Sequence, residues 1–570
     1  MPQEYLCGPI SRSVRSQAVD RVAGEAPVVA APPVRPAHRA PWRAMSTSVN
    51  PPKSPLRAWQ VRALEQLETW DGGPFLISAA PGAGKTRPAL ELARRLLAER
   101  TVARVVVVCP TTPLTRQWAR AAARLGVHLA PDARSSRPPG DFDGVVITYA
   151  RLASNPTGWA RGITPQTLVI ADEAHHLGEE LAWGTAFAAV FRNAPRWLLL
   201  SGTPFRSDAT PIPGVRYDAD GTSMPDVSYT YSEAVGDGVC RRVGFITYDG
   251  TLSWRSGDDV IESSFETVLS TREASRRYRT ATSTELPDGL PRILREAHAK
   301  LVELRAGGHP DAGGLVIAAD RTHAIAISRL MRETTGRAPV VVLHTEARAA
   351  LKLAAFTAST DPWIVAVNMV SEGVDIPRLR VGVYATAAKT PLIFRQIVGR
   401  FVRTISGRPI EASWLYLPAD PILRAHASAV EGELRQSLRR VDDDGIFDEP
   451  REPRRTERSP TPDFVALSAD VAPQLTLFGA PPKPAPAAAA RRALAAEESP
   501  TPPAAFELRA GLRSQRHRLV SDLRRRDGRS HAEINTWLNR AVGITRVEDA
   551  TIDQLEQTIE LLLGTLTARR

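Results

Sequence analysis

Cysteine and long apolar runs are both scarce in this chain of 570 residues. Its cysteines, Cys7, Cys109 and Cys240, lie far apart and form no C-x2-C pair. This argues against a zinc ribbon, a four-cysteine iron–sulfur cluster and a disulfide framework. No run of about 18 uninterrupted apolar residues occurs, which argues against a membrane-spanning helix. We therefore expect the protein in a reducing compartment, the cytoplasm, away from membranes.

Residues 1–50 lack the sustained apolar segment of a secretory signal and are expected to form a disordered extension. The run MSTSVNPPKSPLRAWQ begins at Met45 and leads into the first structured pattern, so we hypothesise that translation starts there. A natural N-terminal peptide from upstream of Met45 would refute this hypothesis.

Acidic residues are outnumbered, since 73 Lys and Arg against 62 Asp and Glu give a net charge of +11. The excess favours polyanionic partners such as nucleic acid. Charge alone does not decide the matter, because GC-rich genomes encode many arginine-heavy proteins that bind nothing acidic.

Two series of short apolar runs predict two α/β domains, at residues 51–210 and 301–445. The first series includes PFLISAA, ARVVVVCP and TLVIADEA, and the second includes GGLVIAAD, PWIVAVNM and SWLYLPA. Strands without polar alternation are buried on both faces, so each domain should hold a parallel sheet covered by helices. The length of the chain also favours two or more domains.

The remaining segments have different compositions. Residues 211–300, with VGFITYDGTLSW and LPRILREAHAKLVELRAGG, are expected to connect the two domains. Residues 446–505 have the composition of a disordered, Pro/Ala-rich linker. Residues 506–570 are expected to form a small basic helical module.

The helical module is predicted from its end signals. Ser530 with Glu533 and Thr551 with Gln554 have capping-box spacing, and Gly543 stands where the helix from Ser530 should end. Its first helix carries seven arginines that either neutralise phosphates or form a solvated face balanced by EDATIDQLEQTIE: Arg513, Arg516, Arg518, Arg524, Arg525, Arg526 and Arg529.

The run AAPGAGKT follows the strand FLIS and nearly matches G-x-x-x-x-G-K-[ST], with Ala79 in place of the first glycine. In this pattern glycines let backbone N–H groups approach phosphate oxygens, the lysine contacts the outer phosphates, and the hydroxyl ligates Mg²⁺. Strand, loop and helix occur in the required order, which predicts nucleotide binding. The residues expected around the phosphates are Pro81, Gly82, Ala83, Gly84, Lys85 and Thr86, with Thr86 also a metal ligand.

A second pattern, ADEAHH, follows the strand TLVI. Adjacent carboxylates at the end of a buried strand are costly unless a cation or a reaction needs them. Asp172 is expected to hold Mg²⁺ through water, and Glu173 to orient and deprotonate an attacking water. Together with the phosphate loop, this pattern predicts a nucleoside triphosphatase.

From about residue 55 to 420 the chain resembles the DEAH-box superfamily 2 helicases and translocases, nearest to the motor subunits of restriction enzymes. LRAWQ resembles the adenine-recognition element, VVCPTTPLTRQW and VVITYARLA resemble strand-contact motifs, and LSGTPFRSD resembles motif III. LVIAADRTHA, NMVSEGVDIP and RQIVGRFVR resemble motifs IV, V and VI. The resemblance implies two tandem RecA-like motor domains, with Gln60 as the amide that recognises the base and with Gly373 and Asp375 linking nucleotide to bound strand.

The second domain is expected to complete the reaction site. Arg400 and Arg403, three apart on a helix beginning near Pro391, are predicted arginine fingers for the γ-phosphate, and Gln396 lies one turn earlier. Gly399 would permit a close backbone approach. The alternative is that these arginines only pair with acidic neighbours.

Nucleic acid is expected to lie across both domains and to be contacted mostly through its backbone. The candidate contacts are Thr111, Thr112, Gln117 and Thr148, each of which is otherwise a polar helix end. The choice of DNA over RNA follows only from the nearest resemblance, and RNA stays open.

A pentapeptide in the Pro/Ala-rich segment, QLTLF, resembles the motif by which bacterial proteins bind the sliding clamp. Gln474, Leu475, Leu477 and Phe478 would supply an amide and apolar side chains to a clamp pocket. The alternatives are that the five residues dock on the protein's own motor domains or occur by chance.

The sequence thus favours an ATP-dependent DNA helicase or translocase. The alternatives are a nucleic-acid-stimulated ATPase that remodels DNA without unwinding it, as the motor subunit of a restriction or defence complex, and a non-catalytic adaptor. Polarity, pathway and oligomeric state are not determined by the sequence.

Overall fold

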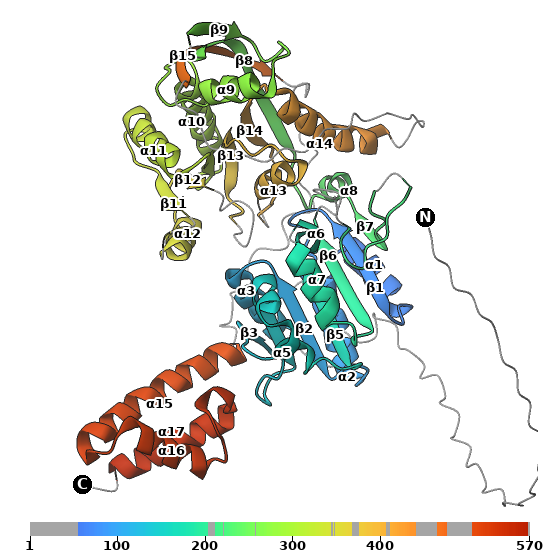
Figure 1. The fold of residues 1–570 in the computed structure, drawn as a ribbon, viewed down its shortest axis with the longest axis vertical. Helices are drawn as coiled ribbons and strands as arrows, with labels where there is room; N and C mark the ends of the chain where they lie inside the picture. The colour runs from blue at the N-terminus through green and yellow to red at the C-terminus, as the bar shows by residue number, and fades with distance from the viewer. Residues whose placement is uncertain are drawn as a thin grey trace, which may run out of the picture. The chain divides into compact units, whose positions relative to one another are not determined.

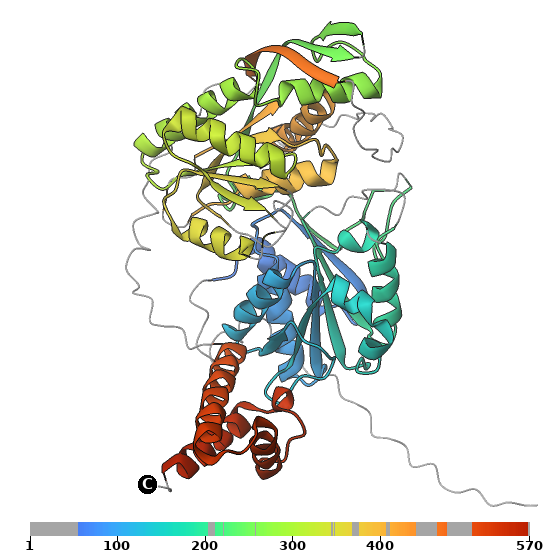
Figure 2. The same cartoon turned by 60° about the vertical axis from the view of Figure 1, so that its left-hand side comes forward.

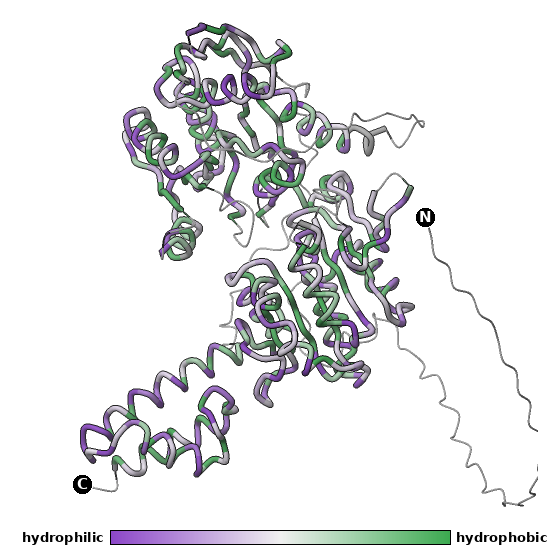
Figure 3. Tube along the Cα trace, viewed as in Figure 1, coloured by the Kyte–Doolittle hydropathy of each residue, from purple (hydrophilic) through white to green (hydrophobic). Residues whose placement is uncertain are grey.

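The protein folds around two β-sheets, as the ribbon of its computed structural model shows (Figure 1). The structure describes residues 55–179, 181–202, 211–219, 222–256, 258–343, 346, 348–367, 376–405, 408, 411–439, 464–475 and 504–567. The central strands of both sheets are largely apolar (Figure 3), as expected for strands buried between layers.

The first sheet has seven strands in the order β3-β4-β2-β5-β6-β1-β7, and every neighbouring pair is parallel. The strands are β1 (Gly73–Ala79), β2 (Arg104–Cys109), β3 (Leu129–Pro131), β4 (Gly144–Thr148), β5 (Thr167–Asp172), β6 (Arg196–Ser201) and β7 (Val227–Tyr229). This pairing confirms the parallel sheet that the unbroken apolar runs predicted. We call this sheet with its helices lobe 1.

The helices of lobe 1 pack on this sheet (Figures 1 and 2). They are α1 (Ala58–Glu68), α2 (Thr86–Ala98), α3 (Thr112–Ala123), α4 (Tyr149–Ser154), α5 (Pro156–Ala160), α6 (His176–Glu179), α7 (Leu181–Val190) and α8 (Tyr231–Gly236). One apolar cluster joins the sheet to α4, α5 and α7 through residues such as Ile147, Leu152, Trp159, Val169 and Phe187. This core fixes the strand ends from which the candidate site is built.

The second sheet follows the order β11-β12-β10-β13-β14-β8-β15, and β9 pairs with β8. The strands are β8 (Val243–Ser256), β9 (Asp259–Ser263), β10 (Gly313–Ala318), β11 (Val340–Leu343), β12 (Trp363–Val367), β13 (Leu379–Ala385), β14 (Ser413–Pro418) and β15 (Phe464–Leu475). Pairing is parallel from β11 to β8, while β9 and β15 are antiparallel to β8. We call this sheet with its helices lobe 2.

Lobe 2 is also covered by helices. They are α9 (Thr271–Ala281), α10 (Leu290–Ala306), α11 (Arg321–Thr335), α12 (Ala349–Ala358), α13 (Pro391–Phe401) and α14 (Pro421–Arg439). The two tandem α/β lobes confirm the predicted fold class. Among the helices that the structure describes, none combines the length and the apolar character that a membrane crossing needs.

The structure divides residues 211–300 differently from the sequence expectation of a separate connector. β7 completes the first sheet beside β1, and β8 enters the second sheet beside β14. The chain therefore passes from lobe 1 to lobe 2 between Tyr229 and Val243. Strand propensity cannot assign a strand to a sheet, because the partner lies far away in sequence: β14 begins at Ser413.

Part of the expected linker 446–505 is also a strand. β15 runs antiparallel to β8, with Gln474 opposite Thr247 and Leu475 opposite Ile246. The first two residues of the QLTLF pentapeptide therefore end an edge strand. Leu477 and Phe478 lie outside the described residues.

The C-terminal module consists of α15 (Ala505–Asp527), α16 (His531–Ala541), the 3₁₀ helix η3 (Val547–Asp549) and α17 (Ile552–Thr567). Both predicted capping boxes are present, at Ser530 and at Thr551. The predicted end of the middle helix is confirmed, since α16 ends just before Gly543 in the left-handed region. A small core holds the helices together: Val520, Leu523, Ile534, Leu538 and Leu562.

The basic run of α15 is not uniformly available for phosphates. Arg516 is buried and donates to Asn535 Oδ1 at 2.8 Å, and Arg529 pairs with Asp527. The other five arginines are exposed, and two of them also form ion pairs, Arg513 with Glu548 and Arg525 with Asp522: Arg513, Arg518, Arg524, Arg525 and Arg526. The module contacts lobe 1 through an ion pair between Glu507 and Arg120, 2.8 Å long.

Candidate active site

The loop between β1 and α2 has the backbone of a phosphate-binding loop. Gly82 and Gly84 adopt φ values of +80° and +88°, a left-handed region that favours glycine. α2 begins at Thr86 with Lys85 before it, so unpaired N–H groups and the positive end of the helix face the loop. The loop can therefore receive an anion such as a triphosphate.

Three residues at the start of α1 hold this loop from behind. Trp59 Nε1 and Arg57 Nη1 both donate to the Ala83 carbonyl, at 3.2 and 2.6 Å. Gln60 Nε2 donates to the Gly84 carbonyl at 3.0 Å, while its Oε1 accepts from the Arg57 amide at 2.9 Å. The amide expected to recognise a base thus also ties α1 to the loop, and that recognition stays a prediction.

Lys85, in the loop after β1, forms an ion pair with Glu173, which follows β5. Lys85 Nζ lies 3.6 Å from Glu173 Oε1 and donates to the Ala79 carbonyl at 3.3 Å. Glu173 follows β5 with φ at +50°, which is strained for a residue with a side chain. With this backbone conformation, the Glu173 carboxylate points toward Lys85 of the phosphate loop.

The pKa values of the neighbouring carboxyls, Asp172 and Glu173, are shifted in opposite directions. Burial, together with the charge of Glu173, raises the pKa of Asp172 to about 6. Burial would also raise the pKa of Glu173, but Lys85 and then the two following histidines outweigh it and lower this pKa to about 2. Glu173 is therefore ionised at neutral pH, which is the form that can accept a proton.

Two buried aromatic residues bond to Asp172. Trp118 Nε1, from α3, donates to Asp172 Oδ2 at 2.7 Å. Tyr149 OH, from α4, donates to the Asp172 main-chain oxygen at 2.8 Å. Neither residue stood out as a candidate in the sequence, although a buried indole N–H or phenol O–H needs an acceptor and this need was the available signal.

His175, in the same segment, contacts both lobes. Its ring is buried, with Nδ1 at 3.2 Å from Ser201 Oγ at the end of β6. Its Nε2 lies 3.4 Å from Gln396 Nε2 on α13. The histidine therefore joins the carboxylate segment of lobe 1 to the predicted catalytic helix of lobe 2.

α13 lies directly against the phosphate loop. A Cβ built on Gly399 would lie 2.8 Å from Pro81 Cβ, so only glycine permits this approach. Arg403 Cγ lies 3.3 Å from a Cβ built on Gly82, and Cys240 Sγ lies 3.4 Å from the Pro81 carbonyl oxygen. Arg400 is half-buried one turn after Gln396. Gln396 and Arg400 thus lie on the helix that touches the loop. Arg403, predicted on the same helix, lies two residues beyond its end at Phe401 and forms a β-bridge with Cys240, because the chain leaves the helix at Val402.

The residues present suit ATP and Mg²⁺. Lys85 offers a cation to phosphate, and Thr86 and Asp172 offer the hard oxygen ligands that Mg²⁺ prefers. Gly373 and Asp375 lie outside the described residues, so their predicted role is not placed.

The candidate nucleic-acid contacts lie at helix starts on lobe 1. Thr111 is the N-cap of α3, and Thr112 and Gln117 are exposed on that helix. Thr148 is the N-cap of α4, where its side chain accepts from the Arg151 amide. The structure is consistent with both the contact role and the alternative of a polar helix end.

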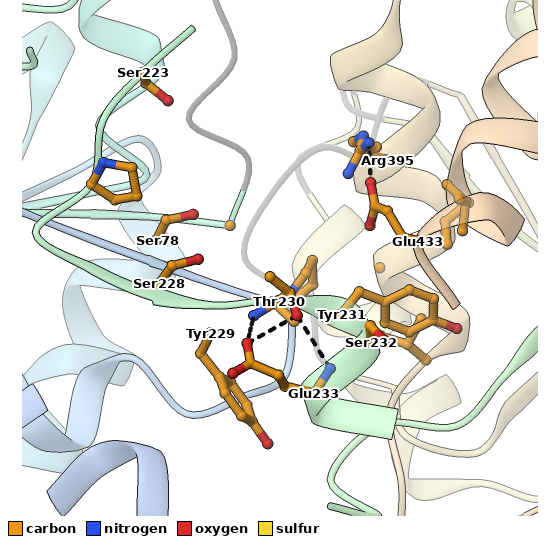
Figure 4. A pocket seen from close by; sticks show the side chains of 18 of the residues that line it. Ser78, Ser223, Ser228, Tyr229, Thr230, Tyr231, Ser232, Glu233, Arg395 and Glu433 are labelled. Atoms are coloured by element: carbon orange, nitrogen blue, oxygen red, sulfur yellow. Dashed lines mark hydrogen bonds and ion pairs between the residues drawn. The ribbon is translucent and has the colours of Figure 1, made fainter. Parts of the chain in front are cut away.

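A cavity of about 560 Å³ lies beside the loop. Figure 4 shows its lining: Ser78, Ser228 and Thr230 from lobe 1 face the Arg395–Glu433 ion pair from lobe 2. Pro81 and Gly399 also line it. The cavity is therefore lined by residues of both lobes, next to the place where they touch.

Among known families, the one described as "Type III restriction enzyme, res subunit" matches residues 53–206. The uncharacterized protein Rv2917 of Mycobacterium tuberculosis is 44% identical over 439 residues, covering 75% of this chain and 72% of that protein. The uncharacterized protein ML1624 of Mycobacterium leprae is 41% identical over 431 residues, covering 73% and 71%.

Solved structures are similar at lower levels. A fragment described as an HsdR subunit of a type I restriction enzyme from Vibrio vulnificus has 17% identity and a TM-score of 0.45, covering 65% of this chain and 64% of that one. S. cerevisiae Dbp5 bound to RNA and ADP BeF3 has 14% identity and a TM-score of 0.40, covering 66% and 87%.

Proposed function

Because this chain belongs to the superfamily 2 helicases, of the kind related to restriction-enzyme motors, and to the same family as mycobacterial Rv2917, we propose that it is an ATP-dependent DNA helicase or translocase. A nucleic-acid-dependent ATPase is the activity that this superfamily carries. Movement along DNA is the finer part of the proposal.

The observation that carries the proposal is the contact of α13 with both halves of the lobe 1 site. Gln396 reaches His175, and Gly399 packs on Pro81. A phosphate loop without residues from a second lobe leaves transition-state charge only partly neutralised. Helix α13 and the segment directly after it can supply the missing positive charge, through Arg400 on the helix and Arg403 beyond its end.

In the proposed cycle ATP bridges the lobes. Lys85 binds the outer phosphates, and Glu173 accepts a proton from the attacking water. Arg400 and Arg403 approach the γ-phosphate. Thr86 and Asp172 would hold Mg²⁺, which would neutralise part of the phosphate charge. Binding then draws the lobes together and hydrolysis releases them, so that nucleic acid contacted by Thr112, Gln117 and Thr148 is gripped alternately.

The decisive experiment measures ATP hydrolysis with single-stranded DNA, duplex DNA and RNA. We expect DNA to stimulate turnover, and we expect Glu173→Gln to abolish it while ATP still binds. Stimulation by RNA alone would overturn the choice of DNA, and hydrolysis that no nucleic acid alters would overturn the proposal as a whole.

The second candidate is an ATPase that remodels DNA without separating strands, as the motor of a restriction or defence complex. The family match to the res subunit of type III restriction enzymes favours it. A strand-displacement assay run beside the ATPase assay separates the two. DNA-stimulated hydrolysis without displacement would select the second candidate.

We also propose a sliding-clamp partner for the pentapeptide from Gln474 to Phe478. The proposal rests on the resemblance of QLTLF to the clamp-binding motif. Gln474 and Leu475 pair with Thr247 and Ile246 of β8, so a clamp would have to compete with this docking on lobe 2. The test measures how much purified clamp is retained by each protein. We expect the wild-type chain to retain the clamp and the variant Leu477→Ala/Phe478→Ala to lose it. Equal retention by both proteins would end this part of the proposal.

A further inference from the structure

Two positions that we expect to contact nucleic acid are each followed by a buried aromatic residue. Gln117 is exposed on α3 and Trp118 after it is buried. Thr148 caps α4 and Tyr149 after it is fully buried. Successive side chains on a helix, or at its start, point in different directions, so each pair joins the surface to the interior.

Both aromatic residues donate a hydrogen bond to the same residue, Asp172. The indole of Trp118 bonds to its carboxylate and the phenol of Tyr149 to its main-chain oxygen. Two separate elements, α3 and α4, thus each place one donor on the residue expected to hold Mg²⁺. A buried acceptor that loses its donor pays its full desolvation cost, so these bonds resist breaking when a helix shifts.

The rest of each element is anchored independently of Asp172. On α3, Thr115 Oγ1 donates at 2.9 Å to Oδ1 of Asp132, which directly follows the edge strand β3. The ring of Tyr149 stacks on Trp183 with centroids 5.8 Å apart. Removing one donor atom therefore leaves most of the packing in place, and the bond to Asp172 can be tested by itself.

We propose that Trp118 and Tyr149 are positioning residues that couple strand binding on α3 and α4 to the carboxylate of Asp172. The inference rests on the proposed function and names its regulation: a strand held at Gln117 and Thr148 fixes α3 and α4, and their two donors fix Asp172. The coupling works in both directions, so occupancy of the nucleotide site strengthens the grip on the strand by the same factor.

The test uses the full chain and the variants Trp118→Phe, Tyr149→Phe and their combination. Each keeps a buried ring and removes a donor. The matched control is Trp197→Phe, which loses an indole bond of 3.2 Å to the Phe191 carbonyl and packs against Phe187 in the core of lobe 1. Two quantities are measured: the ratio of DNA-stimulated to basal turnover, and the ratio of the affinities for a fluorescent non-hydrolysable ATP analogue with and without a dT oligonucleotide.

We expect a wild-type affinity ratio within the range of about 5 to 150 that allosteric coupling usually spans, and a ratio falling to about 1 to 2 in the double variant. Each single variant should lie between, and Trp197→Phe should match wild type. The stimulation ratio should fall in the same order.

Wild-type ratios in the double variant would overturn the coupling. So would a variant whose two affinities both weaken while their ratio is kept, since that is the signature of a merely structural bond. Absence of any DNA effect in wild type would instead refute the proposed function, so the two failures are distinguishable. Tyr149→Phe removes a single oxygen atom, which keeps the test available where the tryptophan variant does not fold.

Discussion

Replacing Gly399 by alanine should push α13 away from the phosphate loop. The added Cβ would lie 2.8 Å from Pro81 Cβ and 3.0 Å from Pro81 Cγ. Carbon atoms pack at about 3.5–4.0 Å, so one side has to retreat by roughly 1 Å. The proline ring has no rotamer that escapes, and α13 would therefore move with Gln396 and Arg400.

A shift of this size should cost activity and not stability. Misplacing reacting groups by about 1 Å can reduce turnover about 100-fold. Alanine replacing glycine inside a helix stabilises it by roughly 1 kcal/mol, which offsets the strain of the contact. We therefore expect kcat to fall about 10- to 100-fold with nearly unchanged thermal stability and ATP affinity.

The assay is steady-state phosphate release with saturating DNA, beside thermal melting of the same samples. Gly432→Ala is the matched control, because Gly432 lies within α14 and a Cβ there meets nothing within 4 Å. It should gain the same helix propensity and keep full activity. A Gly399→Ala enzyme with turnover within about twofold of wild type would refute the argument that this contact positions the catalytic helix.

Three further outcomes follow from the structure. Arg403→Ala should lower kcat by about 10³-fold, as loss of an arginine finger does, while Arg395→Ala, on the neighbouring helix α13, should have little effect on kcat. Gln60→Ala should weaken ATP binding several-fold, measured by titration with a fluorescent analogue, because the α1 bond to the Gly84 carbonyl is lost. Ser530→Ala removes the N-cap of α16 and should destabilise that helix by about 1 kcal/mol, seen as faster amide exchange in its first turn. Wild-type values in any of these measurements would contradict the corresponding contact.

Several features were predictable because they depend on neighbours in the chain. The glycines of the phosphate loop, the boxes at Ser530 and Thr551 and the apolar strand runs each need only a few consecutive residues. Motif order then implied two lobes in tandem. The structure has these elements where the local patterns place them.

Other features depend on partners distant in sequence. The run from 243 to 256 has strand character, but only pairing with β14 and β15 assigns it to the second sheet. The composition of 446–505 predicts a linker, yet β15 within it completes an edge, because backbone hydrogen bonds outweigh weak propensity when a partner strand is available.

By itself, the sequence determined the chemistry that lies in short continuous segments: a loop able to bind phosphate, a carboxylate pair after a buried strand, and a helix with Gln396, Arg400 and Arg403 at helical spacing. Only the tertiary structure decided which of these groups meet. Gly399 against Pro81, His175 against Gln396, and the convergence of two aromatic donors on Asp172 all join segments distant in sequence. The physical reason is that covalent spacing fixes local conformation, whereas contact between distant residues is set by how whole sheets and helices pack.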